Sequence, residues 1–93
     1  MQGRRVYIPE PDEEYPHPLP IDYQPGDYWF SPITKNWYCC CPNGDLGNLS
    51  KHDVIEYEDG TITVSPSILI KWIGENEGRN WHGYLENGIW REI

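Results

Sequence analysis

From residue 26 onward, short runs of apolar and aromatic residues alternate with strong turn signals. Runs of this length bounded by Gly, Asn, Asp and Pro are typical of β-strands, and no stretch shows the 3.6-residue apolar period of an amphipathic helix. The strands expected from these runs are Asp27–Phe30, Trp37–Cys41, Val54–Glu58, Thr61–Val64, Ser67–Ile73, Trp81–Glu86 and Ile89–Glu92. We therefore expect an all-β fold with little or no helix, a small antiparallel sheet of about six strands rolled into a barrel or folded as a sandwich.

Turn residues separate these runs. Asp59-Gly60 and Asn87-Gly88 each lie between two expected strands, and both dipeptides tolerate the positive φ of a type I′ turn, so two tight hairpins are predicted. Ser65-Pro66-Ser67 predicts a bulge or sheet corner, with Pro66 ending one strand and Ile68 starting the next. The looser connections are a hairpin loop over residues 31–36, an irregular loop over 41–50 and a surface turn over 74–78.

Alternation within the strands predicts which residues share a face. Ile62 and Val64 lie on one face of their strand and Thr61 and Thr63 on the other, because successive side chains of a strand point to opposite sides. The same rule places Val54 and Glu56 on one face of their strand and Ile55 and Tyr57 on the other. The expected core consists of Trp37, Ile55, Tyr57, Ile62, Val64, Ile68, Ile70, Trp72, Leu85 and Ile89.

The beginning of the chain differs in kind, because seven of the nine prolines lie at or before Pro32. Proline fixes φ and lacks an amide proton, so regular helix or central strand is not expected there. Residues 1–25 are predicted to be an extended Pro-rich arm, and residues 26–93 the compact β domain. The apolar residues of the arm are suited to lie either against its own domain or against another protein.

Length and charge narrow the class of protein. The 93 residues, 10.9 kDa in mass, suit one domain. Seven Lys and Arg against fifteen Asp and Glu give a net charge of −8, which argues against direct binding to nucleic acid or to an anionic membrane. No apolar run is long enough to cross a bilayer, and the first residues lack the apolar middle of a signal peptide. A cytoplasmic protein is expected, with association with a virion as the alternative.

The three cysteines are consecutive, Cys39, Cys40 and Cys41, so they cannot staple distant parts of the chain. Free thiols suit a reducing compartment. Cys39 and Cys41 share a strand face about 6–7 Å apart, and His82 or His52 on a neighbouring strand could complete a zinc site. The cluster does not have the usual C-x2–4-C spacing, however. No metal or other cofactor is therefore expected. One or two of the thiols are predicted to be buried as small apolar residues and the rest to lie at an edge, with a zinc site as the alternative.

A family resemblance is carried by three motifs: Pro42-Asn43-Gly44, the run from Glu58 to Leu69 (EDGTITVSPSIL), and Trp81-His82-Gly83-Tyr84-Leu85 with Gly88 and Trp90. In this register the chain from Trp37 to its end resembles small uncharacterised proteins of tailed phages and prophages. The resemblance implies a phage or prophage origin and a compact β domain, and it carries no agreed activity. Looser relatives place metal-ligand cysteines near the Cys39–Cys41 position and just before the histidine, where this chain has Asn80 and Trp81.

Catalysis is not expected. No nucleophile signature surrounds the cysteines, and a strand-rich domain of this size has little room for an enclosed substrate pocket. Ser65-Pro66-Ser67 is not a nucleophile elbow. For His82 we favour a structural role, a hydrogen-bonded imidazole that fixes its hairpin against this turn.

The aromatic residues exceed what a small core easily encloses, so some are expected in an exposed patch with an acidic rim. The partner-binding residues expected on this ground are Trp29, Phe30, Glu56, Glu58, Asp59, Trp81, Tyr84, Glu86 and Trp90. The predicted function is a non-catalytic interaction module that binds a host or phage protein, for example by covering the basic surface of a host enzyme or defence protein. The alternatives are a virion or self-assembling component and a zinc module. The oligomeric state stays open.

Overall fold

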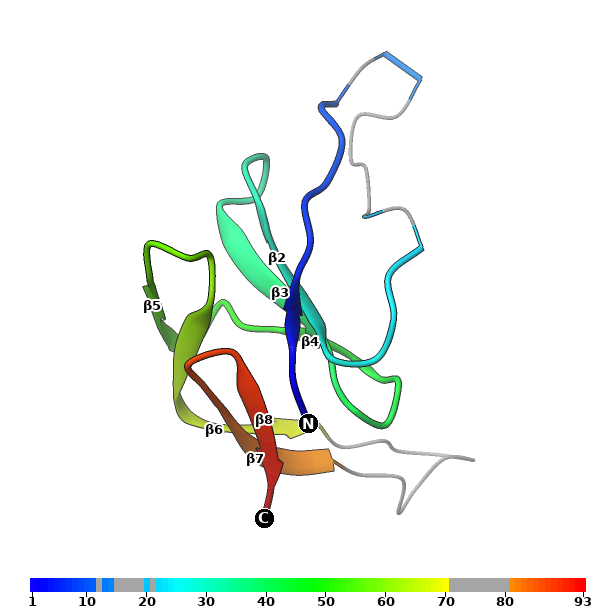
Figure 1. Ribbon diagram of the computed structural model, residues 1–93. Coiled ribbons are helices and arrows are strands. Elements are labelled where there is room, and N and C mark those ends of the chain that lie inside the picture. Colours follow the sequence, from blue (N-terminus) through cyan, green and yellow to red (C-terminus); the bar gives the residue numbers. More distant parts are fainter. Residues whose placement is uncertain (12, 15–19, 21, 71–80) are drawn as a thin grey trace.

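The described chain consists of strands and turns without a helix, as the all-β expectation requires. The computed structural model describes residues 1–11, 13–14, 20, 22–70 and 81–93. Over these ranges the chain forms two four-stranded sheets (Figure 1). The first contains β1 (Arg4–Arg5), β2 (Asp27–Ser31), β3 (Asn36–Cys40) and β4 (Leu46–Asn48), and the second contains β5 (Asp53–Glu56), β6 (Ile62–Ile70), β7 (Trp81–Glu86) and β8 (Ile89–Glu92). In each sheet the strands follow one another in chain order.

The first sheet contains the predicted hairpin and a strand that was not predicted. β2 and β3 pair antiparallel around the loop at residues 32–35, as expected. The expected irregular loop over residues 41–50 is wrong in part, because residues 46–48 form β4 and pair with β3. The reason is the tight reversal at Gly44, whose φ is +93° and whose N–H donates to the Cys41 carbonyl oxygen at 2.7 Å. This turn sends the chain straight back along β3.

The two predicted hairpins of the second sheet differ in their turns. Asn87 and Gly88 both have positive φ, 50° and 76°, as a type I′ turn requires. At the other hairpin only Gly60 has positive φ, so the type I′ prediction is wrong there. The Asp59 carboxylate accepts hydrogen bonds from both the N–H and the hydroxyl of Thr61, which makes an Asx-type turn before the chain enters β6.

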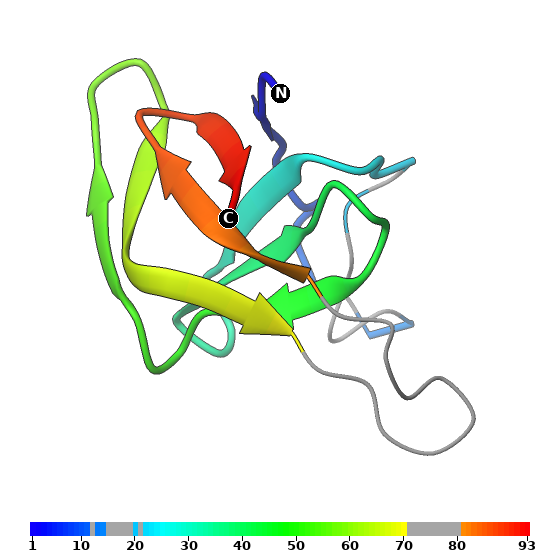
Figure 2. The ribbon, with the colours of Figure 1, turned by 90° about the horizontal axis from the view of Figure 1, so that it is seen from below.

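β6 is one long strand where two were expected. It runs through Pro66 and shifts register between Val64 and Ile68, so the predicted bulge at residues 65–67 is confirmed while the break in the strand is not. Figure 2 shows β6 bending strongly along its length. A β-bulge bends its strand in this way. The first half of β6 pairs with β5, and the second half pairs with β7. Residues 71–73 and 74–78, predicted as strand end and turn, lie outside the described residues.

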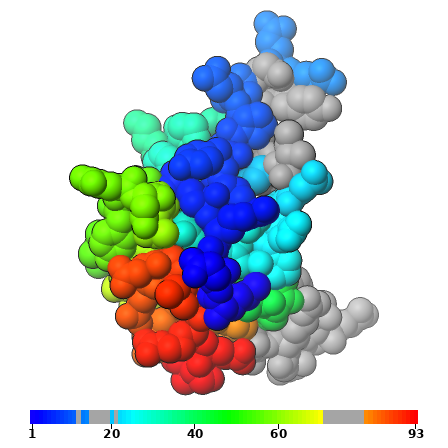
Figure 3. All heavy atoms as spheres, viewed as in Figure 1, coloured from blue at the N-terminus to red at the C-terminus, as the bar shows by residue number. Residues whose placement is uncertain are grey.

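The first residues of the chain join the two sheets. β1 pairs in parallel with β2, and Gln2 forms a bridge with Ile89 of β8. Trp90 N–H also donates to the Met1 carbonyl oxygen at 2.8 Å. Figure 3 shows these residues, in dark blue, lying across the surface between the two sheets. A Pro-rich arm over residues 1–25 is thus not confirmed, because residues 1–5 are paired parts of the fold.

The core lies between the two sheets and is larger than expected. Ile62, Val64, Ile68 and Leu85 are buried as predicted, while Trp37 and Ile70 pack against the core from its margin. Ile55, Tyr57 and Ile89 are exposed, so their assignment to the core was wrong, and Trp72 lies outside the described residues. Outside the cysteine cluster, the core residues that were not predicted are Tyr28, Trp29, Leu49, Trp81 and Trp90.

Candidate interaction surface

The outward side of the β5–β8 sheet carries most of the large exposed apolar side chains of the described residues. Pairing of Val54 with Val64, and of Leu85 with both Val64 and Trp90, defines the side that faces the core. Residues that alternate with these point to solvent. We call the exposed apolar residues on this side the outer apolar face; they are Ile55, Tyr57, Leu69, Tyr84, Ile89 and Ile93.

The register places members of the outer apolar face on all four strands. Ile55 of β5 pairs with Thr63 of β6, and at 56% exposure its side chain is largely open to water. Tyr57 extends the face toward the turn, where its hydroxyl lies 2.9 Å from the Thr63 hydroxyl. Leu69 pairs with His82 in the β6–β7 ladder. On the other side of β7, the Ile93 N–H donates to the His82 carbonyl oxygen at 2.9 Å, which holds Ile93 next to His82. Apolar and small polar side chains thus alternate across the sheet.

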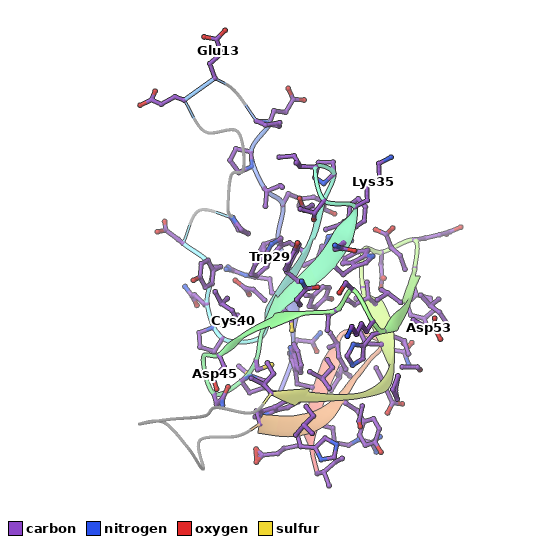
Figure 4. The ribbon with its side chains drawn as sticks, turned by 180° about the vertical axis from the view of Figure 1, so that it is seen from behind. Glu13, Trp29, Lys35, Cys40, Asp45 and Asp53 are labelled. Atoms are coloured by element: carbon purple, nitrogen blue, oxygen red, sulfur yellow. The ribbon has the colours of Figure 1, made fainter. Side chains whose placement is uncertain are left out.

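Charge is distributed unevenly along this sheet. At the β8 side, Glu86 is paired with Arg91, with 2.6 Å between Oε1 and Nη2. At the β5 side, Asp53, Glu58 and Asp59 are exposed, and the nearby cation in sequence is Lys51. Hydrogen bonds from Thr61 lower the pKa of Asp59, so this carboxylate stays charged to lower pH than usual. The β5 end is therefore the acidic end of the surface, and Figure 4 shows Asp53 at its margin.

One carboxylate at this end is tied to the first sheet. Glu56 accepts a hydrogen bond from Arg5 Nη1 at 2.7 Å, and the same nitrogen donates to the Gly60 carbonyl oxygen at 3.1 Å. The Arg5 guanidinium lies over the Trp37 and Tyr7 rings, 4.6 and 4.7 Å from their centroids. Arg5 thus fixes the position of the β5–β6 hairpin relative to the first sheet.

Three of the expected partner-binding tryptophans are not on the surface. Trp29, Trp81 and Trp90 are 3%, 2% and 2% exposed, so the expectation that they belong to an exposed patch is wrong. Trp81 and Trp90 pack edge to face with ring centroids 5.2 Å apart. The indole N–H of Trp90 donates to the Gly26 carbonyl oxygen at 2.8 Å. The expectation considers residues 26–93 alone, whereas the N-terminal residues cover part of the core, with Gly3 against Tyr28 and Trp90.

The other expected partner-binding residues are accessible but divided between the sheets. Phe30 is half-buried on the first sheet, against Trp37 at 5.4 Å between ring centroids. Tyr84 and Glu86 lie on the outward side of β7, while Glu58 and Asp59 lie in the β5–β6 turn beside Glu56. Their role in binding stays a prediction. Some residues of the outer apolar face, such as Leu69 and Ile93, were not predicted from the sequence. The register of the predicted hairpins could have identified them, because it assigns each strand position to one side of the sheet.

All three cysteines are buried and free, so the expectation that some of them are small core residues is confirmed and the expectation that the rest lie at an edge is wrong. The sulfurs of Cys39 and Cys41 are 4.0 Å apart, closer than the spacing along the strand suggested. Their hydrogen bond, followed by burial, raises the pKa of the Cys39 thiol well above the ordinary 9.0. Burial also raises the pKa of Cys40, near Asp27 and Asp45. Protonated thiols of this kind are poor nucleophiles.

His82 does not join the cysteines. Its Nε2 lies 2.9 Å from the Ser67 hydroxyl, which confirms the expected contact between this histidine and the turn at residues 65–67. His52 Nε2 donates to the Ser67 carbonyl oxygen at 3.2 Å. His82 alternates with the core residues Trp81 and Gly83, so it is on the opposite side of its sheet from the cysteine pair. Among the described residues, no three His, Cys, Asp or Glu side chains are grouped to hold a metal ion.

Comparisons with protein-family models, curated proteins and solved structures found no match to this chain. The resemblance to phage and prophage proteins therefore stays a prediction. Within the described ranges, no helix has the length and apolar character needed to span a membrane.

Proposed function

We propose that this protein is a non-catalytic interaction module that binds a partner protein through the outer apolar face. The observation that supports the proposal is the gathering of Ile55, Leu69, Tyr84, Ile89 and Ile93 on one side of one sheet. Isolated exposed apolar residues are common, but a group of them on one face is typical of a binding surface. Water is released from these side chains when a partner covers them, which favours association.

The partner we propose is a protein with an apolar patch beside basic residues. The net charge of −8 and the acidic β5 end favour such a surface, because opposite charges speed the encounter and orient the complex. In the phage setting that the sequence resemblance implies, a host enzyme or defence protein with a basic surface is the candidate partner. A second copy of the chain in a virion component is the rival, since the same face could bury itself in a homo-oligomer.

The test compares one surface variant with one control variant. The whole protein, immobilised on resin, is used to capture partners from host lysate at about 50 mM and about 500 mM salt, since salt screens exposed charge pairs. The test variant carries Leu69→Ser and Tyr84→Ser on the outer apolar face. The control carries Leu46→Ser, which removes a similarly exposed leucine from the first sheet. Circular dichroism checks that each variant is folded.

The expected result is one partner that is weakened by salt, lost by the outer-face variant and kept by the Leu46→Ser control. Purified partner then has to bind the wild-type protein directly in calorimetry. Retention of the partner by the outer-face variant contradicts the proposal. If the outer-face variant instead dissociates a homo-oligomer of the purified protein, the self-assembling alternative replaces it.

A further inference from the structure

At the outer edge of β5, some backbone groups have no partner among the described residues. β5 is the terminal strand of its sheet, and in Figure 2 it is the outermost strand on its side. The Tyr57 N–H donates to the Thr61 carbonyl oxygen at 2.9 Å at the end of the β5–β6 ladder. Hydrogen-bonded and non-bonded pairs alternate in an antiparallel ladder, so Ile55 and Asp53 also bond to β6. The N–H and C=O groups of Val54 and Glu56 consequently point away from the sheet.

The two edges of this sheet differ in whether other backbone segments pair with them. The β8 edge is covered by the N-terminal residues through the Gln2–Ile89 bridge and the bond from Trp90 N–H to Met1 O. No described strand covers the β5 edge, and among the described residues the outward N–H groups of Val54 and Glu56 have no backbone partner. An uncovered edge is a ready template for another extended chain.

The side chains at this edge favour a basic occupant. Asp53 begins the strand, Glu58 and Asp59 follow in the turn, and Ile55 is exposed between them, while Glu56 is already paired with Arg5. A second copy of the chain would bring the same carboxylates against one another, which opposes pairing of like edges. A chain with apolar residues in its middle and basic residues toward its ends would instead place apolar side chains beside Ile55 and Tyr57, and pair its charges with Asp53 at one end and with Glu58 and Asp59 at the other.

We infer that the β5 edge binds an extended, basic segment of a partner protein by adding it as a further strand to the β5–β8 sheet. The inference rests on the proposed function and specifies how the partner is recognised. The added strand extends the outer apolar face past Ile55, so edge pairing and apolar contact act on the same partner. Main-chain bonds supply affinity in this mode, and the alternating side chains supply selectivity.

The probe is a fluorescein-labelled peptide of about eight residues, a usual strand length, with valines in the middle and lysines at both ends. The control peptide has the same side chains and charge, but every backbone nitrogen is methylated, so it cannot donate to the edge. Binding to the whole protein is followed by fluorescence anisotropy. Amide exchange is followed by NMR at Val54 and Glu56, whose N–H groups face outward, and at Ile55, whose N–H is already bonded.

The expected result is that the peptide binds and slows exchange at Val54 and Glu56 by about tenfold or more, with a smaller change at Ile55. Asp53→Asn should weaken peptide binding by about threefold. The control is Glu92→Gln, which removes one carboxylate at the β8 edge of the sheet and should weaken binding less. Equal binding of the methylated peptide, or binding without protection of these two amides, overturns the inference. So does protection that appears with protein concentration alone, which would identify a second copy as the occupant.

Failure of this inference can be told from failure of the proposed function. If the Leu69→Ser, Tyr84→Ser variant loses its partner while the peptide leaves the edge amides unchanged, the outer apolar face stands and strand addition does not. If the edge amides are protected but that variant keeps its partner, strand addition stands and binding through the outer apolar face does not.

Discussion

Arg4 holds Asp27 with two parallel hydrogen bonds, from Nε to Oδ1 at 3.0 Å and from Nη2 to Oδ2 at 2.7 Å. The Asp27 side chain is buried and also accepts the Gln24 N–H at 2.8 Å. Hydrogen bonding to Asp27 raises the pKa of Arg4, so the Arg4 guanidinium remains charged across the physiological range. Since Arg4 and Asp27 are also partners in the β1–β2 ladder, this contact fastens the N-terminal strand to the first sheet.

The first prediction concerns this pair. Arg4→Met should destabilise the fold because it leaves the buried Asp27 carboxylate without its cation. The matched control is Arg91→Met, which breaks the exposed pair with Glu86 and should change the unfolding free energy by less than about 1 kcal/mol. Urea unfolding followed by circular dichroism measures both. Equal midpoints for the two variants would show that the Arg4–Asp27 contact contributes no more than a surface pair.

The second prediction compares two buried tryptophans that pack against each other. Trp90→Phe removes the indole N–H that donates to Gly26, whereas Trp81→Phe removes a buried N–H that has no partner among the described residues. Both lose ring area, but only the first breaks a hydrogen bond. Trp90→Phe should therefore cost about 1–2 kcal/mol more unfolding free energy than Trp81→Phe. Urea titrations by circular dichroism test this, and a larger cost for Trp81→Phe would contradict it.

The third prediction is a loss of stability at alkaline pH. The pKa of Cys39 is raised by its bond to Cys41 and by burial, and burial raises the pKa of Tyr28. Unfolded protein therefore releases these protons at lower pH than folded protein, so the folded state binds more protons above pH 9.0, the ordinary value for a thiol. The contribution of these two groups to the unfolding free energy should be constant below that pH, and the unfolding free energy should fall as pH rises through it.

The variant Cys39→Ser tests the assignment of this effect, because a serine hydroxyl does not titrate in this range. Its urea midpoint should fall less between about pH 8 and about pH 10 than that of the wild type, with a residual decrease from Tyr28. An identical decrease in the two proteins would mean that Cys39 does not cause it. A rise in wild-type stability with pH would reverse the sign and contradict the burial of the protonated thiols.

Local sequence signals predicted much of the second sheet. Asn87-Gly88 adopts the predicted turn because both residues tolerate positive φ, a property that depends on the dipeptide alone. Ile62 and Val64 are buried on one side of β6 because alternation along a strand is a local geometric rule. The contact between His82 and the turn at Ser67 was predicted from the same hairpin arrangement. Of the candidate site, Tyr84 and Glu86 were correctly expected to be accessible.

Local patterns along the chain were thus enough to predict the all-β class, most strand positions and the sharing of faces within each strand. Which of the two faces is buried depends on how the strands pair across the fold. Ile55 and Val54 are equally apolar, but pairing with Val64 turns Val54 toward the core and leaves Ile55 outside. The tertiary structure also decided that residues 1–5 join the two sheets and bury Trp90. These pairings connect residues that are far apart in sequence, so the alternation within one strand does not reveal them. The location of the interaction surface depends on these pairings.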